Sequence, residues 1–268
     1  MRRSFSTVRL TAAALPLALA VAFSGPAARA STKTSVPPLM HMKVDTSNLA
    51  NLRTGALYVL HRCAACHSIQ GTRFSSIAKQ LGITNSEMQK YLNESGRLVH
   101  DTVVTAMPKG IMKQFVSITP PDLTVMAEAQ SPDWLYTYLK SFYLDPTRPT
   151  GVNNVLFHNV AMPDVLANLQ GLQSPVIKEG WLYGQPAKVA MGVKQLTKGT
   201  MTPAQFDQTA QDIVDFLYVV AHPHAKERAA LGPWIMGLFG LLTIFSFLLY
   251  KVYWRRVDTS HERWWNHR

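Results

Sequence analysis

The sequence predicts a mostly α-helical fold with long loops and one C-terminal transmembrane helix. Apolar residues recur at three- and four-residue spacing in several segments, a pattern typical of helices packed on a core. Residues 229–250 form an apolar run without a charged side chain, and about 20 such residues cross the hydrocarbon core of a bilayer as a helix. Between residues 143 and 200, Pro, Gly and Asn are frequent and periodicity is weak. This region therefore predicts long loops, with a short hairpin near 175–190.

The N-terminal segment is typical of a secretory signal peptide. Three arginines accompany an apolar run over residues 10–23, and Ala28-Arg29-Ala30 fits a cleavage site. Prolines and the shortness of the run argue against a first transmembrane helix. Residues 1–30 are therefore predicted to be removed on export, and the mature chain to begin at Ser31. Residues 31–228 then form one periplasmic domain with its own core, opening with an irregular arm over 31–46.

Four segments within this domain carry helical patterns, beginning near Leu49, Thr84, Ser131 and Thr202. Thr84 with Glu87 forms a capping box, and Thr202 with Gln205 has the same spacing. Ser131 precedes a proline at the first helical position. The apolar face predicted for this third helix consists of Trp134, Leu135, Tyr138, Leu139 and Phe142.

The flanks of the apolar run 229–250 indicate how it lies in a membrane. Lys251 and Arg255 follow it, beside Tyr253 and Trp254. Aromatic residues at the interface and positive charge beyond it predict a cytoplasmic tail over residues 251–268. A buried core helix is disfavoured because the run is apolar all round.

The formal charge of the chain is +11. The four arginines of residues 1–30 and a net +3 from residues 251–268 leave +4 for the part between them. So mild an excess in an exported protein argues against nucleic acid as a partner.

The segment Cys63-Ala64-Ala65-Cys66-His67 contains both cysteines of the chain. C-x-x-C-H is the attachment pattern of c-type haem: the thiols form thioethers with the vinyl groups, and the histidine binds the iron. A zinc site would need a second pair of ligands, and the chain has no other cysteine to supply it. A thioredoxin-like disulfide would lie in a βαβ unit, which the sequence does not predict. The motif therefore predicts one covalent haem c. A helix before it, another later and loops between them fit a class I cytochrome c-like haem domain.

The second axial ligand is left open by the residues alone. The candidates are Met107, Met112, Met126, Met162, Met191, Met201, His100 and His158. A methionine gives a higher potential than a second histidine. Met107 and Met162 are the two stronger candidates, because a proline follows each and stiffens its loop. This reasoning does not choose between them.

Further motifs resemble the cytochrome c1 family in residues and order. They are Thr119-Pro120-Pro121-Asp122-Leu123, the run 134–143, the run 148–154 leading into Asn159-Val160-Ala161-Met162-Pro163, and the run 212–217 leading through His222-Pro223 to the anchor and Tyr253-Trp254. The resemblance covers roughly residues 48–256.

The resemblance implies the haem subunit of a cytochrome bc1 complex, the ubiquinol–cytochrome c reductase. It implies one-electron transfer without bond chemistry in this chain, from the Rieske iron–sulfur protein to a periplasmic cytochrome c or similar acceptor. Cytochrome b, membrane lipid and a dimeric complex are the other implied partners. His67 and Met162 would be the iron ligands, whereas Met107 matches a family Met-Pro segment that does not bind. Pro121 matches a proline packed on the haem, and Asn154 lies in a loop near it.

Two departures from the family accompany this resemblance. The family usually reads Ala-Arg-Ala-Arg where this chain has Ala127-Glu128-Ala129-Gln130. The second arginine pairs with a haem propionate, which Gln130 cannot do. The favoured explanation is that a basic residue such as Arg73 or Arg97 replaces it. The alternative is a shifted potential or a proton-rich compartment, where a propionate is more often neutral. Many relatives also present an acidic face to a basic cytochrome c, whereas this domain is basic. The acceptor therefore stays open.

Two rival functions remain at the level of sequence. A membrane-anchored cytochrome c shuttle or oxidase subunit shares the signal, haem and anchor, but not the Pro-Pro-Asp-Leu and Met162 segments or a C-terminal anchor. A haem sensor or peroxidase would have an open iron site and bind carbon monoxide or peroxide.

Overall fold

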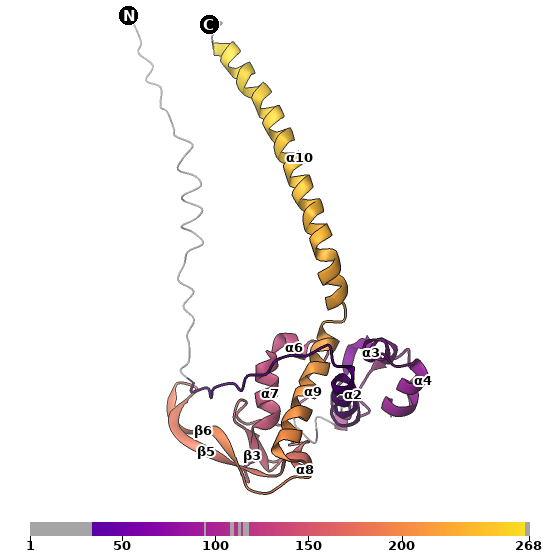
Figure 1. The fold of residues 1–268 in the computed structure, drawn as a ribbon. Coiled ribbons are helices and arrows are strands. Elements are labelled where there is room, and N and C mark those ends of the chain that lie inside the picture. Colours follow the sequence, from indigo (N-terminus) through magenta and orange to yellow (C-terminus); the bar gives the residue numbers. More distant parts are fainter. Residues whose placement is uncertain (1–33, 94, 108–109, 112–113, 115–117, 266–268) are drawn as a thin grey trace, which may run out of the picture. The chain divides into compact units, whose positions relative to one another are not determined.

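The computed structural model describes residues 34–265 apart from 94, 108–109, 112–113 and 115–117 (Figure 1). The predicted signal peptide lies outside the described residues. The described chain divides into two compact units. One contains residues 34–36 and 177–189, and the other contains residues 37–176 and 190–265.

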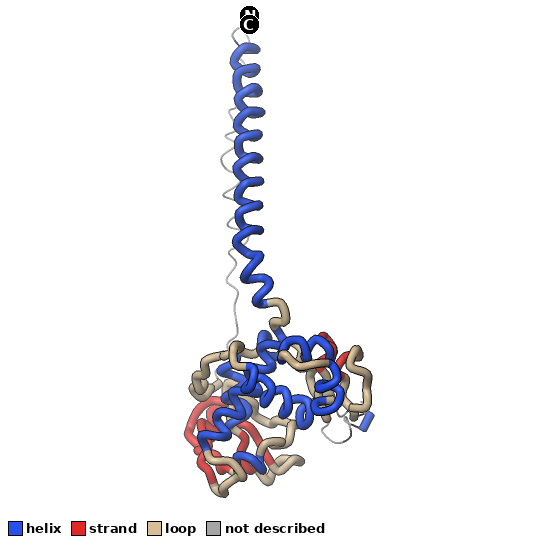
Figure 2. The backbone as a smooth tube through the Cα atoms, turned by 45° about the vertical axis from the view of Figure 1, so that its right-hand side comes forward, coloured by secondary structure: helices blue, strands red, loops and turns tan. Residues whose placement is uncertain are grey.

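Helices carry most of the regular structure (Figure 2). They are α2 (Leu49–Tyr58), α3 (Phe74–Leu81), α4 (Asn85–Glu87), α6 (Met126–Ala129), α7 (Pro132–Lys140), α8 (Ala167–Gln170), α9 (Pro203–Ala221) and α10 (Ala225–Trp265), with π-helical segments η1 (Val59–Cys63) and η2 (Met88–Leu92). The strands form two-stranded sheets: β1 (Ile69–Arg73) with β2 (Thr102–Val103), β3 (Phe142–Leu144) with β4 (Val152–Asn154), and β5 (Gln173–Leu182) with β6 (Gln185–Gln195).

The predicted helix starts are confirmed. Thr84 and Thr202 each form a capping box. The Ser131 hydroxyl accepts a hydrogen bond from the Trp134 amide at 3.2 Å, with proline at the first position of α7. These side chains satisfy amide groups that a helix start leaves without a partner.

The region 143–200 is more regular than predicted. The hairpin runs over residues 173–195 rather than 175–190, and β3, β4 and α8 lie where loops were expected. The assignment of Phe142 to the helical face is also wrong, because α7 ends at Lys140 and Phe142 opens β3.

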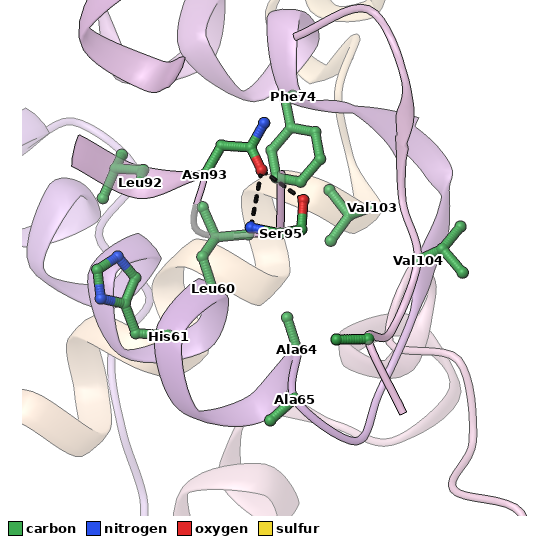
Figure 3. A pocket seen from close by; sticks show the side chains of 11 residues that line it. Leu60, His61, Ala64, Ala65, Phe74, Leu92, Asn93, Ser95, Val103 and Val104 are labelled. Carbon is green, nitrogen blue, oxygen red and sulfur yellow. Dashed lines mark hydrogen bonds between the residues drawn. The ribbon is translucent and has the colours of Figure 1, made fainter. Parts of the chain in front are cut away.

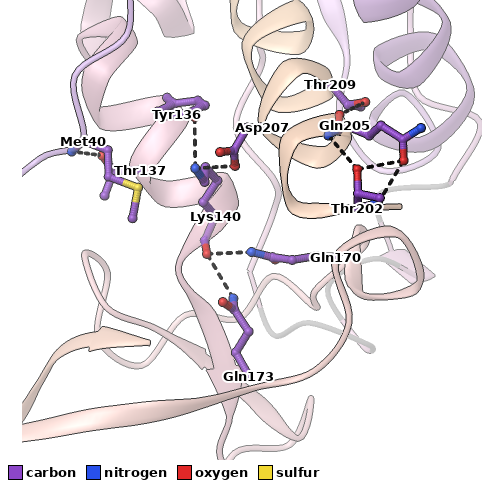
Figure 4. A network of polar contacts seen from close by, with 10 residues as sticks. All are labelled: Met40, Tyr136, Thr137, Lys140, Gln170, Gln173, Thr202, Gln205, Asp207 and Thr209. Carbon is purple, nitrogen blue, oxygen red and sulfur yellow. Dashed lines mark hydrogen bonds and ion pairs between the residues drawn. The ribbon is translucent and has the colours of Figure 1, made fainter. Parts of the chain in front are cut away.

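A polar network explains this early helix end (Figure 4). The side-chain amides of Gln170 and Gln173 both donate to the Lys140 carbonyl at 3.0 Å, and Gln173 also donates to the Phe142 carbonyl at 2.9 Å. The Lys140 ammonium pairs with Asp207 at 2.5 Å. Long-range partners thus bind the carbonyls at the end of α7, which periodicity within one segment does not reveal.

The main core centres on α2 and α9, which approach closely at Gly55. A Cβ atom on Gly55 would lie 1.9 Å from the Asp212 carbonyl oxygen. Leu52 and Ala56 of α2 and Ile213 of α9 are almost fully buried around this crossing. Only glycine therefore allows the two backbones to come this close.

The C-terminal helix α10 contains the predicted span 229–250. It has 41 residues, which corresponds to about 60 Å of helix, so it exceeds the roughly 30 Å hydrocarbon core at both ends. The segment Glu227–Arg255 is long and apolar enough to cross a membrane, and its side chains are not buried against the rest of the chain. This helix fits a single-pass membrane anchor.

We expect Gly55→Ala to lower the free energy of unfolding by about 1–3 kcal/mol, because the added methyl group forces α2 and α9 apart. Thermal unfolding of the detergent-solubilised protein measures this. Gly192→Ala is the matched control, because its Cβ would meet only Val176 at an ordinary 3.8 Å. Equal melting temperatures for the two variants would contradict the close crossing.

We expect the Asp215 carboxyl group to make the stability of the folded protein depend on pH between about 4 and about 6. Burial raises the pKa of this carboxyl group to about 6, aided by the nearby Asp212 and Asp45 charges. In the unfolded chain the group ionises near about 4. Between these values the folded state binds more protons, so its stability falls as pH rises from about 4 to about 6. Asp215→Asn should remove this fall, as followed by melting temperature against pH. Parallel curves for variant and wild type would exclude this role.

Candidate functional site

The cysteine motif follows α2 through a widened helical turn. In η1 the Ala64 amide donates to the Val59 carbonyl at 2.8 Å, five residues back. The amides of Cys66 and His67 then both donate to the Cys63 carbonyl, at 3.1 and 2.8 Å. The motif is thus a compact turn that begins where the helix ends, with both thiols free and partly buried.

The chemistry of the thiols separates the possible uses of the motif. Burial, together with the neighbouring Cys66, raises the pKa of Cys63 to about 12. A redox-active C-x-x-C pair needs a lowered thiol pKa instead. Among the described residues, no group of three His, Cys, Asp or Glu side chains could hold a metal ion. The raised thiol pKa therefore disfavours a redox disulfide.

The His67 ring is oriented by a single backbone oxygen. Its Nδ1 lies 2.7 Å from the Pro121 carbonyl oxygen, which can only accept a hydrogen bond. Nδ1 therefore carries the proton and Nε2 keeps its lone pair, the tautomer that a metal-binding imidazole needs. Burial also lowers the His67 pKa, partly offset by Pro121 and Asp122. The neutral ligand form is favoured.

The Pro121 carbonyl is positioned by pairing of residues 121–124 with residues 68–71. The Leu123 amide donates to the Ser68 carbonyl at 2.8 Å, and the Gln70 amide donates to Asp122 Oδ2 at 2.9 Å. The Gly71 amide donates to the Thr124 hydroxyl at 3.0 Å. A Cβ on Gly71 would lie 2.3 Å from the Thr124 methyl group. Local hydrogen bonds thus fix the Pro-Pro-Asp-Leu segment beside the motif.

A cavity of about 180 Å³ lies beside the same turn (Figure 3). Ala64 and Ala65 line it, together with apolar side chains such as Phe74 and Val103, and with Asn93. Neither cysteine nor His67 lines it. The cavity therefore meets the motif at its two alanines rather than at its thiols or imidazole.

Met162 lies on a second loop, in contact with α7. Its Sδ accepts a hydrogen bond from the Tyr138 hydroxyl at 3.4 Å. The fully buried Asn154 joins this loop to α7: its Nδ2 donates to the Tyr138 carbonyl at 2.8 Å. Its Oδ1 accepts from the Ser141 hydroxyl at 3.3 Å and the Leu156 amide at 2.9 Å. Asn154 thus fixes the loop that carries Met162.

A second asparagine fastens the same loop. Asn153 Oδ1 accepts from the amides of Asn159 and Val160, at 2.9 and 3.4 Å. The Arg148 guanidinium donates to the side chain and carbonyl of Asn159, at 3.1 and 3.2 Å. Asn159 has a φ of 62°, a left-handed conformation that asparagine tolerates better than most residues. The chain just before Met162 therefore follows a defined path.

The other candidate ligands occupy different surroundings. Met107 follows Thr105, whose hydroxyl donates to the Ala65 carbonyl at 2.7 Å. Met126 begins α6, Met191 lies in β6, and the Met201 sulfur accepts from the Thr209 hydroxyl at 3.6 Å. Met112 lies outside the described residues. Burial lowers the pKa of His158, and the His100 carbonyl accepts a hydrogen bond from Arg73.

Tyr138 is the residue of this site that sequence reasoning missed. Its position on the apolar face of α7 indicated only packing. The signal was present, because a buried tyrosine hydroxyl requires a hydrogen-bond partner. The pattern could not tell which of the distant side chains would provide it.

Comparisons with known proteins agree with this arrangement. The Cytochrome C1 family matches residues 40–257. The chain is 39% identical to cytochrome c1 of Allochromatium vinosum, over 80% of this chain and 87% of that protein. It belongs to the cytochrome c1 family. It is also 34% identical to the ammonia monooxygenase gamma subunit of Nitrosomonas europaea, over 80% and 86% of the two chains. Cytochrome c1 of Rhodobacter capsulatus is 25% identical, over 76% and 82%.

Membership of the cytochrome c1 family identifies the chain as the haem-carrying electron-transfer subunit of a bc1 complex. Cytochrome b and the Rieske protein are the other subunits of that complex. It is the redox subunit of an oxidoreductase and carries one covalent haem c. The donor set fits this group: two free thiols separated by two residues, and an imidazole with an available Nε2. The prediction of covalent haem is thus confirmed at the level of the family.

We expect Asn154→Ala to lower the free energy of unfolding by on the order of 2 kcal/mol, because it leaves the buried partners of Asn154 without hydrogen bonds. Thermal unfolding followed by haem absorbance measures this. Asn85→Ala is the control, since Asn85 is an exposed residue of α4. An unchanged melting temperature for the Asn154 variant would show that the loop is held by other contacts.

Proposed function

We propose that this chain accepts one electron from the Rieske iron–sulfur protein and passes it to a periplasmic cytochrome c or similar acceptor. When bound, the haem supplies an iron atom that alternates between the ferric and ferrous states. The observation that carries the proposal is the hydrogen bond from His67 to Pro121, which leaves Nε2 available immediately after the two thiols.

Different residues would attach the haem, bind its iron and orient the ligands. Cys63 and Cys66 would attach the haem covalently, and His67 and Met162 would bind its iron. Pro121 orients the His67 ring through its carbonyl oxygen. Asn154 holds the Met162 loop against α7. These contacts restrict the freedom of both ligand loops.

The proposal extends to the placement of the chain in the membrane. Residues 1–30 are a signal peptide, 31–228 a periplasmic class I cytochrome c-like domain, 229–250 the span and 251–268 a cytoplasmic tail. The apolar helix α10 and the basic residues after Tyr250 support this orientation. The complex would be dimeric, as the family resemblance implies.

We expect Met162→Leu in the purified membrane complex to lose the far-red absorption band of a methionine-ligated ferric haem and to show a large fall in potential, because a leucine cannot donate to iron. An optical spectrum and redox titration measure both. Met107→Leu is the matched control at the other Met-Pro segment.

The two methionine variants separate the alternatives. An unchanged Met162 variant beside an altered Met107 variant would assign the ligand to Met107. If both are unchanged and the wild type binds carbon monoxide readily, the iron site is open, as expected for a sensor or peroxidase.

A further inference from the structure

The Met162 sulfur has a neighbour that ligation to iron does not require. The Tyr138 hydroxyl lies 3.4 Å from Met162 Sδ. A thioether sulfur has no hydrogen to give, so the phenol is the donor. The sulfur has two lone pairs, and one can bind a metal while the other accepts this hydrogen bond.

The aromatic side chains of α7 hold the phenol in place. Tyr138 stacks on Trp134 with ring centroids 5.0 Å apart and an interplanar angle of 10°. Its edge meets Phe142 at 5.1 Å and 72°. Residues four apart share a face of a helix, so Trp134 and Tyr138 form a ladder along α7 that continues into Phe142 at the start of β3. The phenol ring is thus oriented independently of the sulfur.

The backbone of Tyr138 is tied to the same loop as its side chain. Its carbonyl accepts the Asn154 side-chain amide at 2.8 Å. Asn153 in turn fixes the chain at Val160, two residues before Met162. A shift of the loop would therefore break the contacts with both ends of Tyr138, so the distance between phenol and sulfur is set by the fold.

A tyrosine phenol keeps its proton at neutral pH, because it ionises only near about pH 10, so this group stays a donor. Donation to the sulfur withdraws electron density from the lone pair shared with iron. The ferric state demands more of this density than the ferrous state, so the hydrogen bond favours the reduced form.

We propose that Tyr138 is a positioning residue for Met162 that raises the haem potential through its hydrogen bond to the sulfur. This inference rests on the proposed function, in which Met162 is the iron ligand. It adds a determinant of potential in α7, outside the two ligand segments.

The experiment compares Tyr138→Phe with the wild type in the full-length protein within its complex. The substitution removes one oxygen atom and keeps the ring that stacks on Trp134. We expect the far-red band to persist at a shifted wavelength. We expect the equilibrium constant for reduction to fall by up to about tenfold, which is ~59 mV for one electron. Tyr136→Phe is the matched control on the same helix, since its hydroxyl contacts Lys140 at 3.0 Å rather than a methionine.

A double-variant cycle with Met162→Leu distinguishes the possible failures. Without the sulfur, Tyr138→Phe should cause no further change in potential. If Met162→Leu alters spectrum and potential but Tyr138→Phe behaves like Tyr136→Phe, the inference about Tyr138 is wrong and the ligand assignment stands. Equal shifts from Tyr138→Phe in both backgrounds would also overturn it. If Met162→Leu changes nothing, the ligand assignment fails, and this inference fails with it.

Discussion

The close approach of α2 and α9 at Gly55 is the constraint on which the rest of the haem domain depends. The helix α2 runs directly into η1 and so places Cys63. The helix α9 also packs against α6, α7 and α8, and α7 carries Tyr138 and the contacts to Asn154. The cysteine motif, through α2, and the Met162 loop, through α7, are therefore both positioned by packing on α9. A displacement of α2 along α9 would move the attachment motif relative to the Met162 loop.

Loops, rather than helices or sheets, carry His67 and Met162, the proposed iron ligands, and polar side chains give those loops their shape. Asp122 accepts from backbone amides on one side of the site, and Asn153 and Asn154 do so on the other. Short side chains of this kind form hydrogen bonds that regular secondary structure would otherwise provide. Buried amide groups need partners in any fold. This explains how irregular segments can hold an imidazole and a thioether in fixed orientations.

The parts of the fold that sequence reasoning predicted are those encoded by neighbouring residues. Capping pairs such as Thr202 with Gln205 act within one helical turn, and the cysteine motif acts within five residues. The end of α7 depends instead on Gln170 and Gln173, some thirty residues later. The partner of Tyr138 is likewise set by tertiary structure. Periodicity reports which face of a helix is buried, but it does not report what a buried hydroxyl touches.

The departure at residues 127–130 has a structural counterpart at the end of α9. Where relatives usually carry an arginine, Glu128 pairs with His222 Nε2 at 2.8 Å, and the Nδ1 of this ring lies 2.9 Å from the Tyr218 carbonyl. Both ring nitrogens thus face groups that only accept hydrogen bonds. The ring is also stacked on Tyr218, with centroids 4.2 Å apart.

An acidic residue at position 128 therefore joins α6 to the segment that leads into α10. The exchange of charge at Glu128 is thus a local adaptation between α6 and α9. The loss of charge at Gln130 is a separate change, because Gln130 ends α6 through its backbone amide, which donates to the Met126 carbonyl at 2.9 Å.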